Sequence, residues 1–160
     1  MDTLTPEKRH ENMSHIHGKD SKPEVIVRHY LFSRGLRYRK NDKRLPGHPD
    51  IVLPKYRTVI FVNGCFWHGH KGCRFFRIPS TNVDFWKTKI LNNINRDEKV
   101  FGELKTEGWQ VITIWECQVR KTAERDIILD EVFQTIIEHS FKQPTPKKQL
   151  NKPSQITKQN

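Results

Sequence analysis

The feature that most restricts the fold of this sequence is the continuous apolar run Thr58-Val59-Ile60-Phe61-Val62, in which β-branched side chains predominate. A run without polar alternation is typical of a central strand that is buried on both faces. The segments at 50–53 and 109–115, which are also rich in apolar residues, are expected to form further strands. We therefore expect a small sheet with residues 58–62 near its centre.

A helix is expected immediately before this group of strands. Ser21 and Glu24 have the spacing of a capping box, in which the two side chains bind backbone N–H groups at the start of a helix. Apolar positions then recur as far as Arg34, and Gly35 provides a stop. The pattern predicts a helix that ends near residue 34.

Two longer helices and one more strand complete the expected elements. Amphipathic stretches at 83–107 and 123–140 predict helices, with Asn82 as the candidate cap of the first. Segment 36–39 alternates apolar and basic residues, as a half-buried strand would. The resulting order, α-β-β-β-α-β-α in a chain of 160 residues, predicts an α/β fold with a small mixed β-sheet flanked by helices.

The charge of the chain indicates a polyanionic partner. With 29 Lys+Arg against 18 Asp+Glu, the net charge is +11, which favours nucleic acid, although a basic surface without a specific partner has the same composition. Residues 142–160 contain five lysines and no acid, and are expected to be a disordered basic tail. Residues 1–20 are expected to be an arm that orders on DNA, which leaves 21–141 as the folded domain.

Membrane and secretory classes are not favoured. No apolar stretch approaches the length of a transmembrane helix, and the first residues lack the apolar core of a signal peptide. A cytoplasmic protein without a membrane partner is therefore expected.

Cysteine and histidine residues gather in the loop after the central strand. The spacing Cys65-x4-His70-x2-Cys73 suits a zinc ion, which takes four ligands at tetrahedral corners. Spacing alone leaves the fourth ligand open between Cys117 and His68. Three free thiols and an exposed histidine are the alternative.

Asp50 is the single carboxylate between Lys43 and Val83, a stretch with seven Lys+Arg. It is either a turn former after Pro49 or a metal-binding acid that faces DNA phosphates. Pro49-Asp50 before two strands is similar to the Pro-Asp…(Asp/Glu)-x-Lys motif of restriction-type nucleases. The corresponding triplet here, 61–63, contains neither an acid nor a lysine.

The adjoining loop makes the match specific. Segment 63–73, Asn-Gly-Cys-Phe-Trp-His-Gly-His-Lys-Gly-Cys, resembles the signature loop of the very short patch repair (Vsr) endonucleases, which nick DNA beside a T:G mismatch left by deamination of 5-methylcytosine. The resemblance extends over residues 7–140, and further matching motifs are Asn12-Met13, Leu45-Pro46-Gly47-His48-Pro49-Asp50, Ile78-Pro79, Phe85-Trp86, Arg96-Asp97 and Trp115-Glu116-Cys117.

This resemblance implies a restriction-endonuclease-like core, a Mg²⁺-dependent nicking activity 5′ of the T, and a structural zinc. The implied catalytic residues are Asp50 as Mg²⁺ ligand, Glu24 organising water, His68 near the leaving oxygen, and Asp97 orienting His68. The implied zinc ligands are Cys65, His70, Cys73 and Cys117.

The resemblance also implies a set of DNA contacts on double-stranded DNA with a T:G mismatch. The implied residues are an aromatic wedge of Phe66, Trp67 and Trp86, the arm residue Met13 entering from the other groove, and Lys89 and Asn93 at the mismatch. Without the resemblance, Phe66-Trp67 reads equally well as a buried aromatic pair. Association with mismatch-repair proteins and with the nucleoid is a further expectation.

One position departs from the family pattern. A histidine commonly precedes Gly64 in the family, and here the residue is Asn63, which cannot exchange a proton near pH 7. Val62 stands before it, where its backbone carbonyl can still reach a metal. The departure leaves two other functions open: a nicking or restriction enzyme of different specificity, and a zinc-stabilised DNA-binding module without catalysis.

Overall fold

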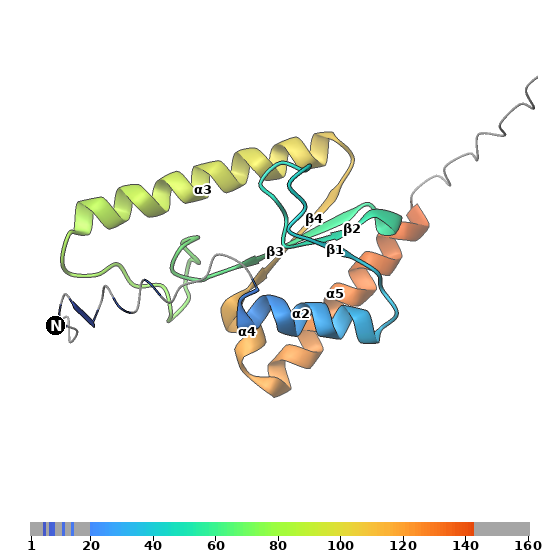
Figure 1. Ribbon diagram of the computed structural model, residues 1–160, viewed down its shortest axis with the longest axis horizontal. Helices are drawn as coiled ribbons and strands as arrows, with labels where there is room; N and C mark the ends of the chain where they lie inside the picture. The colour runs from blue at the N-terminus through green and yellow to red at the C-terminus, as the bar shows by residue number, and fades with distance from the viewer. Residues whose placement is uncertain (1–4, 6, 9–10, 12–13, 15–19, 143–160) are drawn as a thin grey trace, which may run out of the picture.

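The computed structural model describes Thr5, Glu7, Lys8, Glu11, Ser14 and residues 20–142. Most of the predicted arm, including Met13, and the predicted tail beyond residue 142 lie outside the described residues. Within the described part, four strands form one sheet with helices on both faces (Figure 1).

The elements in chain order are α2 (Lys22–Ser33), β1 (Arg39–Lys40), β2 (Ile51–Leu53), the 3₁₀ turn η1 (Pro54–Tyr56), β3 (Thr58–Asn63), α3 (Val83–Thr106), β4 (Gln110–Trp115), α4 (Glu116–Arg120) and α5 (Thr122–Lys142).

The sheet is mixed, as predicted. Its strand order is β1-β2-β3-β4, with antiparallel pairing of β1 to β2 and β2 to β3 and parallel pairing of β3 to β4. A parallel pair needs a long crossover connection, and α3 supplies it here. The apolar run at 58–62 is therefore an inner strand, because β3 is hydrogen-bonded on both sides.

Alternate side chains of the strands build two cores, one on each face of the sheet. The face toward α2, α4 and α5 buries Ile51, Leu53, Ile60 and Ile114 together with Val27, Leu31, Val119, Leu129 and Ile136 of the helices. The opposite face buries Val52, Val59 and Phe61 against Leu104 of α3. In Figure 1, α3 accordingly lies on one side of the sheet, and α2, α4 and α5 lie on the other.

Helix α2 begins as predicted. The Ser21 side chain accepts from the Glu24 N–H, and the Glu24 side chain accepts from the Ser21 N–H, which completes the capping box. The helix ends at Ser33, and a turn with Gly35 in the left-handed region (φ 82°) follows. This turn places Leu36 in the core at 2% exposure.

Three local predictions need correction. The strand expected at 36–39 is confined to Arg39–Lys40, because the turn after α2 directs Leu36 into the helical layer. Asn82 precedes α3 but its side chain makes no capping hydrogen bond, since its own backbone adopts a left-handed conformation (φ 53°). The short helix α4 was not predicted, because five residues carry too little periodicity to detect.

The described helices include none that is long and apolar enough to cross a membrane. The predicted fold class, a mixed α/β sheet flanked by helices, is confirmed.

Candidate active site and metal centre

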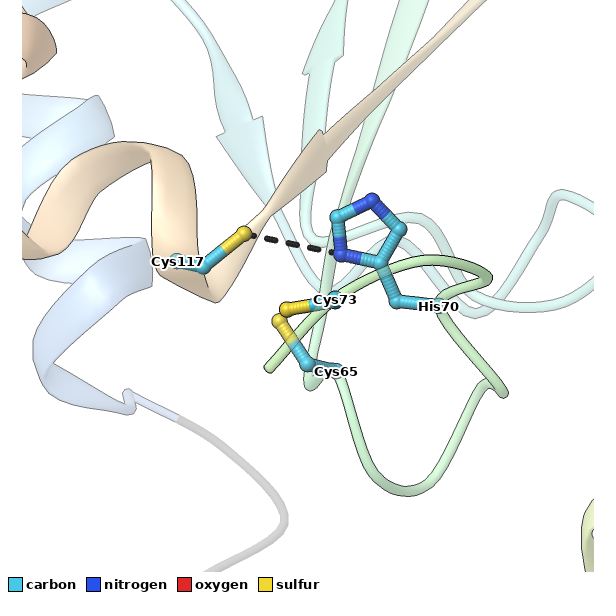
Figure 2. Close-up of side chains that lie close together, drawn as sticks. All are labelled: Cys65, His70, Cys73 and Cys117. Atoms are coloured by element: carbon cyan, nitrogen blue, oxygen red, sulfur yellow. Dashed lines mark hydrogen bonds between the residues drawn. The ribbon is translucent and has the colours of Figure 1, made fainter. Parts of the chain in front are cut away.

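The four residues expected to bind zinc lie together. Cys65, His70 and Cys73 come from the loop after β3, and Cys117 comes from α4 (Figure 2). One ligand atom from each residue lies within 4.8 Å of the others, and the Cys117 Sγ is 3.5 Å from the His70 Nδ1. Three sulfurs and one imidazole nitrogen at this spacing could hold one metal ion.

Packing fixes the orientation of this cluster. The His70 ring stacks on Trp115, the last residue of β4, with centroids 4.1 Å apart and planes within 2°. Backbone hydrogen bonds from His70 N to Cys65 O and from Cys73 N to His70 O fold the loop around the sulfurs. Burial raises the pKa of Cys65 and of Cys117, so these thiols require a nearby cation to become thiolates at neutral pH.

Of the two candidates for the fourth ligand, Cys117 lies in the cluster and His68 does not. The His68 Nδ1 makes a short contact with the Asp97 Oδ2 on α3. Burial raises the pKa of Asp97, but the hydrogen bond and charge of His68, with Arg96 beside it, outweigh burial and hold the pKa below its ordinary value. This contact holds the imidazole of His68 against α3.

Asp50 lies at the start of β2, against the end of β3. Its Oδ2 accepts a hydrogen bond of 2.7 Å from the Val62 N–H. Burial raises its pKa to about 6, the hydrogen bond from Val62 opposes this, and the charge of Glu24 adds to it. A carboxylate that is buried beside a second acid is characteristic of a site that binds a cation.

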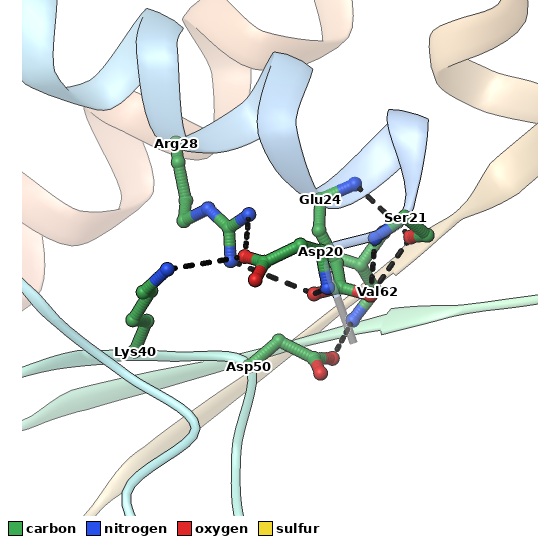
Figure 3. A network of polar contacts seen from close by, with 7 residues as sticks. All are labelled: Asp20, Ser21, Glu24, Arg28, Lys40, Asp50 and Val62. Atoms are coloured by element: carbon green, nitrogen blue, oxygen red, sulfur yellow. Dashed lines mark hydrogen bonds and ion pairs between the residues drawn. The ribbon is translucent and has the colours of Figure 1, made fainter. Parts of the chain in front are cut away.

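Glu24 is the second acid of this site. It is 5% exposed at the first turn of α2, above the end of β3 (Figure 3). Its Oε1 accepts from the Ser21 hydroxyl at 2.8 Å, and its Oε2 accepts from the Asp20 N–H at 3.0 Å. The capping box therefore holds the carboxylate in a fixed orientation close to Asp50.

Asn63 is the last residue of β3, pairs with Trp115 of β4, and is 5% exposed. A neutral amide at this position can donate and accept hydrogen bonds but cannot carry a proton between water and substrate. Of positions 63 and 68, only His68 can therefore exchange a proton.

The three predicted wedge residues form one aromatic cluster. Phe66 contacts Trp67 and Trp86 at centroid distances of 5.1 and 5.3 Å, and the two tryptophans are 6.0 Å apart. All three are half-buried, and Phe85 beside them is 60% exposed. The cluster therefore belongs to neither core of the sheet, which argues against a simple core role.

Helix α3 packs against this loop. The Asn93 amide donates to the Trp67 carbonyl at 2.9 Å. At Gly69 (φ 63°), a Cβ would lie 2.7 Å from the Ile94 Cδ1, so a larger residue would displace this side chain and would also strain the backbone. Lys89 is exposed on the same helix.

The sequence analysis missed a charged network beside Glu24. Arg28, Asp20 and Lys40 surround the acid, and the only sequence signal was the i,i+4 spacing of Glu24 and Arg28. Asp20 and Lys40 carried no signal, because their contact depends on the tertiary fold.

Comparison with known proteins identifies the family. The profile of the family described as DNA mismatch endonuclease Vsr matches residues 1–74. DNA mismatch endonuclease Vsr of Escherichia coli (strain K12) is 39% identical over 130 residues, which are 81% of this chain and 81% of the relative. Type II nicking enzyme V.NmeAIP of Neisseria meningitidis is 52% identical over 122 residues, 76% of this chain and 86% of the relative. Type II nicking enzyme V.XorIIP of Xanthomonas oryzae pv. oryzae is 46% identical over 118 residues, 74% of this chain and 86% of the relative. The chain therefore belongs to the Vsr family of DNA mismatch endonucleases and is a DNA endonuclease.

Proposed function

We propose that this enzyme nicks one strand of duplex DNA 5′ of the T in a T:G mismatch produced by deamination of 5-methylcytosine, in a Mg²⁺-dependent reaction. The observation that carries the proposal is the convergence of Asp50, Glu24 and His68 at one end of the sheet, with Phe66 and Trp67 of the aromatic cluster directly before His68 in the same loop. Two acids supply a cation site and a histidine supplies a proton, which is the chemistry that phosphodiester hydrolysis requires.

Each residue of this site would have its own role in the reaction. Asp50 and the Val62 backbone carbonyl would hold Mg²⁺, which supplies a polarised phosphate and an activated water. Glu24 orients the attacking water. His68, fixed by Asp97, gives a proton to the leaving 3′ oxygen as the P–O bond breaks, so that the phosphate remains on the 5′ end.

Asn63 is not a candidate proton carrier, because its amide does not exchange a proton near neutral pH. In this position it orients water or phosphate through its amide, and catalysis depends on His68 and the metal. This enzyme therefore has one histidine in the site that can transfer a proton, His68, whereas a family member with a histidine before Gly64 has two.

We assign zinc to the Cys65, His70, Cys73 and Cys117 cluster. Four protein ligands close the coordination of zinc and leave no position for substrate, so the ion is structural. Its position between β3 and α4 braces the loop that carries Phe66, Trp67 and His68.

We assign mismatch recognition to the aromatic cluster. Phe66, Trp67 and Trp86 would enter the base stack. Unstacking a T:G pair costs less free energy than unstacking a Watson–Crick pair, so insertion favours the mismatch. Lys89 and Asn93 would contact the mismatch from α3, and Met13 would enter from the opposite groove. We further propose three parts of the chain: residues 1–20 as an arm that orders on DNA, 21–141 as the endonuclease domain and 142–160 as a basic tail. The enzyme would act in the cytoplasm at the nucleoid, with mismatch-repair proteins as further partners.

A second candidate function follows from the relatives. Several are named type II nicking enzymes, so a nicking endonuclease of different sequence specificity has the same family and the same site. The site chemistry would be unchanged, and only the recognised bases would differ.

A nicking assay on matched and T:G duplexes, with and without Mg²⁺, separates these functions. The proposal expects nicks only on the T:G duplex and only with Mg²⁺. Nicking of matched DNA at defined sites would favour the second candidate. Tight T:G binding without any nick under all divalent cations tested would leave a DNA-binding module.

A further inference from the structure

Arg28 is a buried cation at the edge of the candidate active site. It is 5% exposed and lies on α2 one turn after Glu24. Its NH2 is 2.5 Å from the Asp20 Oδ1, and its NH1 is 3.5 Å from the Glu24 Oε2. A buried guanidinium is costly unless it is paired, and an apolar side chain of similar volume often serves stability as well. Stability alone therefore gives a weak reason for this arginine.

Contacts of Asp20 connect this arginine to the strands below it. Asp20 adopts a left-handed backbone conformation (φ 56°), and its N–H donates to the Glu24 Oε2 at 3.0 Å. Its carboxylate also lies 3.3 Å from the Lys40 Nζ. Lys40 is in β1 and pairs with Ile51, the residue after Asp50. Figure 3 shows the contacts that run from Arg28 on α2 through Asp20 to Lys40 on β1, the neighbour of β2 in the sheet.

The two acids of the site repel each other. Asp50 interacts unfavourably with the like charge of Glu24 and favourably with His68 and with Arg28. Repulsion between two buried carboxylates would displace the less constrained one unless a cation holds it. Restriction-type motifs carry a lysine on the second strand, and the corresponding triplet 61–63 has none.

We infer that Arg28 is a positioning residue for DNA nicking: its buried guanidinium, anchored by Asp20, holds the Glu24 carboxylate beside Asp50 so that the two acids bind one divalent cation together. The inference rests on the proposed function, because it takes Asp50 and Glu24 as the cation site. Arg28 supplies from α2 the fixed positive charge that β3 lacks.

The sign of a metal-binding change distinguishes positioning from simple charge. If Arg28 only adds a positive charge nearby, its removal relieves repulsion and a divalent cation binds more tightly. If Arg28 holds Glu24 in place, its removal leaves only the capping-box hydrogen bonds to hold Glu24 against the charge of Asp50, and the cation binds more weakly. Loss of a group that orients a metal ligand typically costs about 10- to 100-fold in affinity or activity.

The test is Mn²⁺ binding to the full zinc-loaded chain, followed by electron paramagnetic resonance of free Mn²⁺, with Asp50→Ala as the blank. Arg28→Met should weaken Asp50-dependent Mn²⁺ binding by about 10- to 100-fold. The single-turnover nicking rate at saturating Mg²⁺ and T:G duplex should fall over a similar range. Duplex affinity without divalent cations should change little, since one charge among many is removed.

Two further variants keep the test decisive. Arg28→Lys retains the charge but cannot both hydrogen-bond Asp20 and place a second nitrogen beside Glu24. Positioning therefore expects a smaller loss of Mn²⁺ affinity than in the methionine variant, and charge alone expects no loss. The lysine variant also serves if the methionine variant does not fold. Arg34→Met is the matched control, because Arg34 follows the same helix, pairs with Asp130 and lies away from Glu24. It should bind Mn²⁺ and nick as the wild type does.

Unchanged or tighter Mn²⁺ binding in the folded Arg28 variants would overturn the inference. If the wild type nicks and binds Mn²⁺ but these variants match it, only the role of Arg28 is rejected. If the wild type shows no Asp50-dependent Mn²⁺ binding, the proposed cation site is rejected and the role of Arg28 falls with it.

Discussion

Replacing Asp50 by asparagine should make the metal-free enzyme more stable while it abolishes nicking. Burial raises the pKa of this carboxyl from 3.8 to about 6 in the folded chain. A rise of about two pH units corresponds to about 3 kcal/mol at about 1.4 kcal/mol per unit. The ionised carboxylate therefore lowers the free energy of unfolding at pH 7 by at most that amount. Asparagine keeps an oxygen that can accept from the Val62 N–H and removes the charge.

The pH dependence has a definite sign. An acid with a raised folded pKa destabilises the fold as pH rises from its unfolded value to its folded value. The advantage of Asp50→Asn should thus be nearly absent at pH 3.8, reach about half its full size near pH 5, and be complete above pH 7. For a chain of this size the full effect corresponds to about 6–12 °C in Tm.

The assay is thermal unfolding of zinc-loaded protein without Mg²⁺ across this pH range. Added Mg²⁺ should stabilise the wild type and not the variant, because only the wild type keeps the charged ligand. Asp42→Asn is the control of opposite sign, since the side chain of Arg44 holds the pKa of Asp42 near 2 and the ionised form stabilises the fold. An Asp50→Asn variant that is less stable than the wild type at pH 7 would refute the reasoning.

Three more predictions test the other parts of the site. Cys117→Ser should lose the bound zinc, measured by elemental analysis, and unfold at lower temperature; well-folded wild-type protein without zinc would reject the assignment. Trp67→Ala should weaken T:G binding about 5- to 150-fold in titrations at fixed salt and leave matched-duplex binding nearly unchanged, and equal losses on both duplexes would mean that the cluster is only structural. Gly69→Ala should lower Tm and the nicking rate more than Gly72→Ala, because both glycines have positive φ but only a Cβ at Gly69 meets Ile94; equal effects would show that backbone strain alone matters.

Several features were determined by the sequence because they depend on neighbouring residues. The capping box at Ser21 and Glu24 is complete within four residues, so the start of α2 was predictable. The apolar run at 58–62 has no amphipathic alternative, so an inner strand was predictable too. The three members of the metal-binding cluster candidate that lie in one loop, Cys65, His70 and Cys73, were recognisable from their spacing.

Other features were decided only by the tertiary structure, because they join residues that are distant in the chain. Cys117 completes the metal cluster since the parallel pairing of β3 and β4 brings the start of α4 to the loop. His68 lies outside that cluster and contacts Asp97 of α3 instead. Arg28 and Lys40 meet on Asp20 because α2 packs over the strands, and no local pattern specifies that packing. Local hydrogen bonding defines the elements of this enzyme, and the long-range packing of the sheet against its helices assembles the candidate active site.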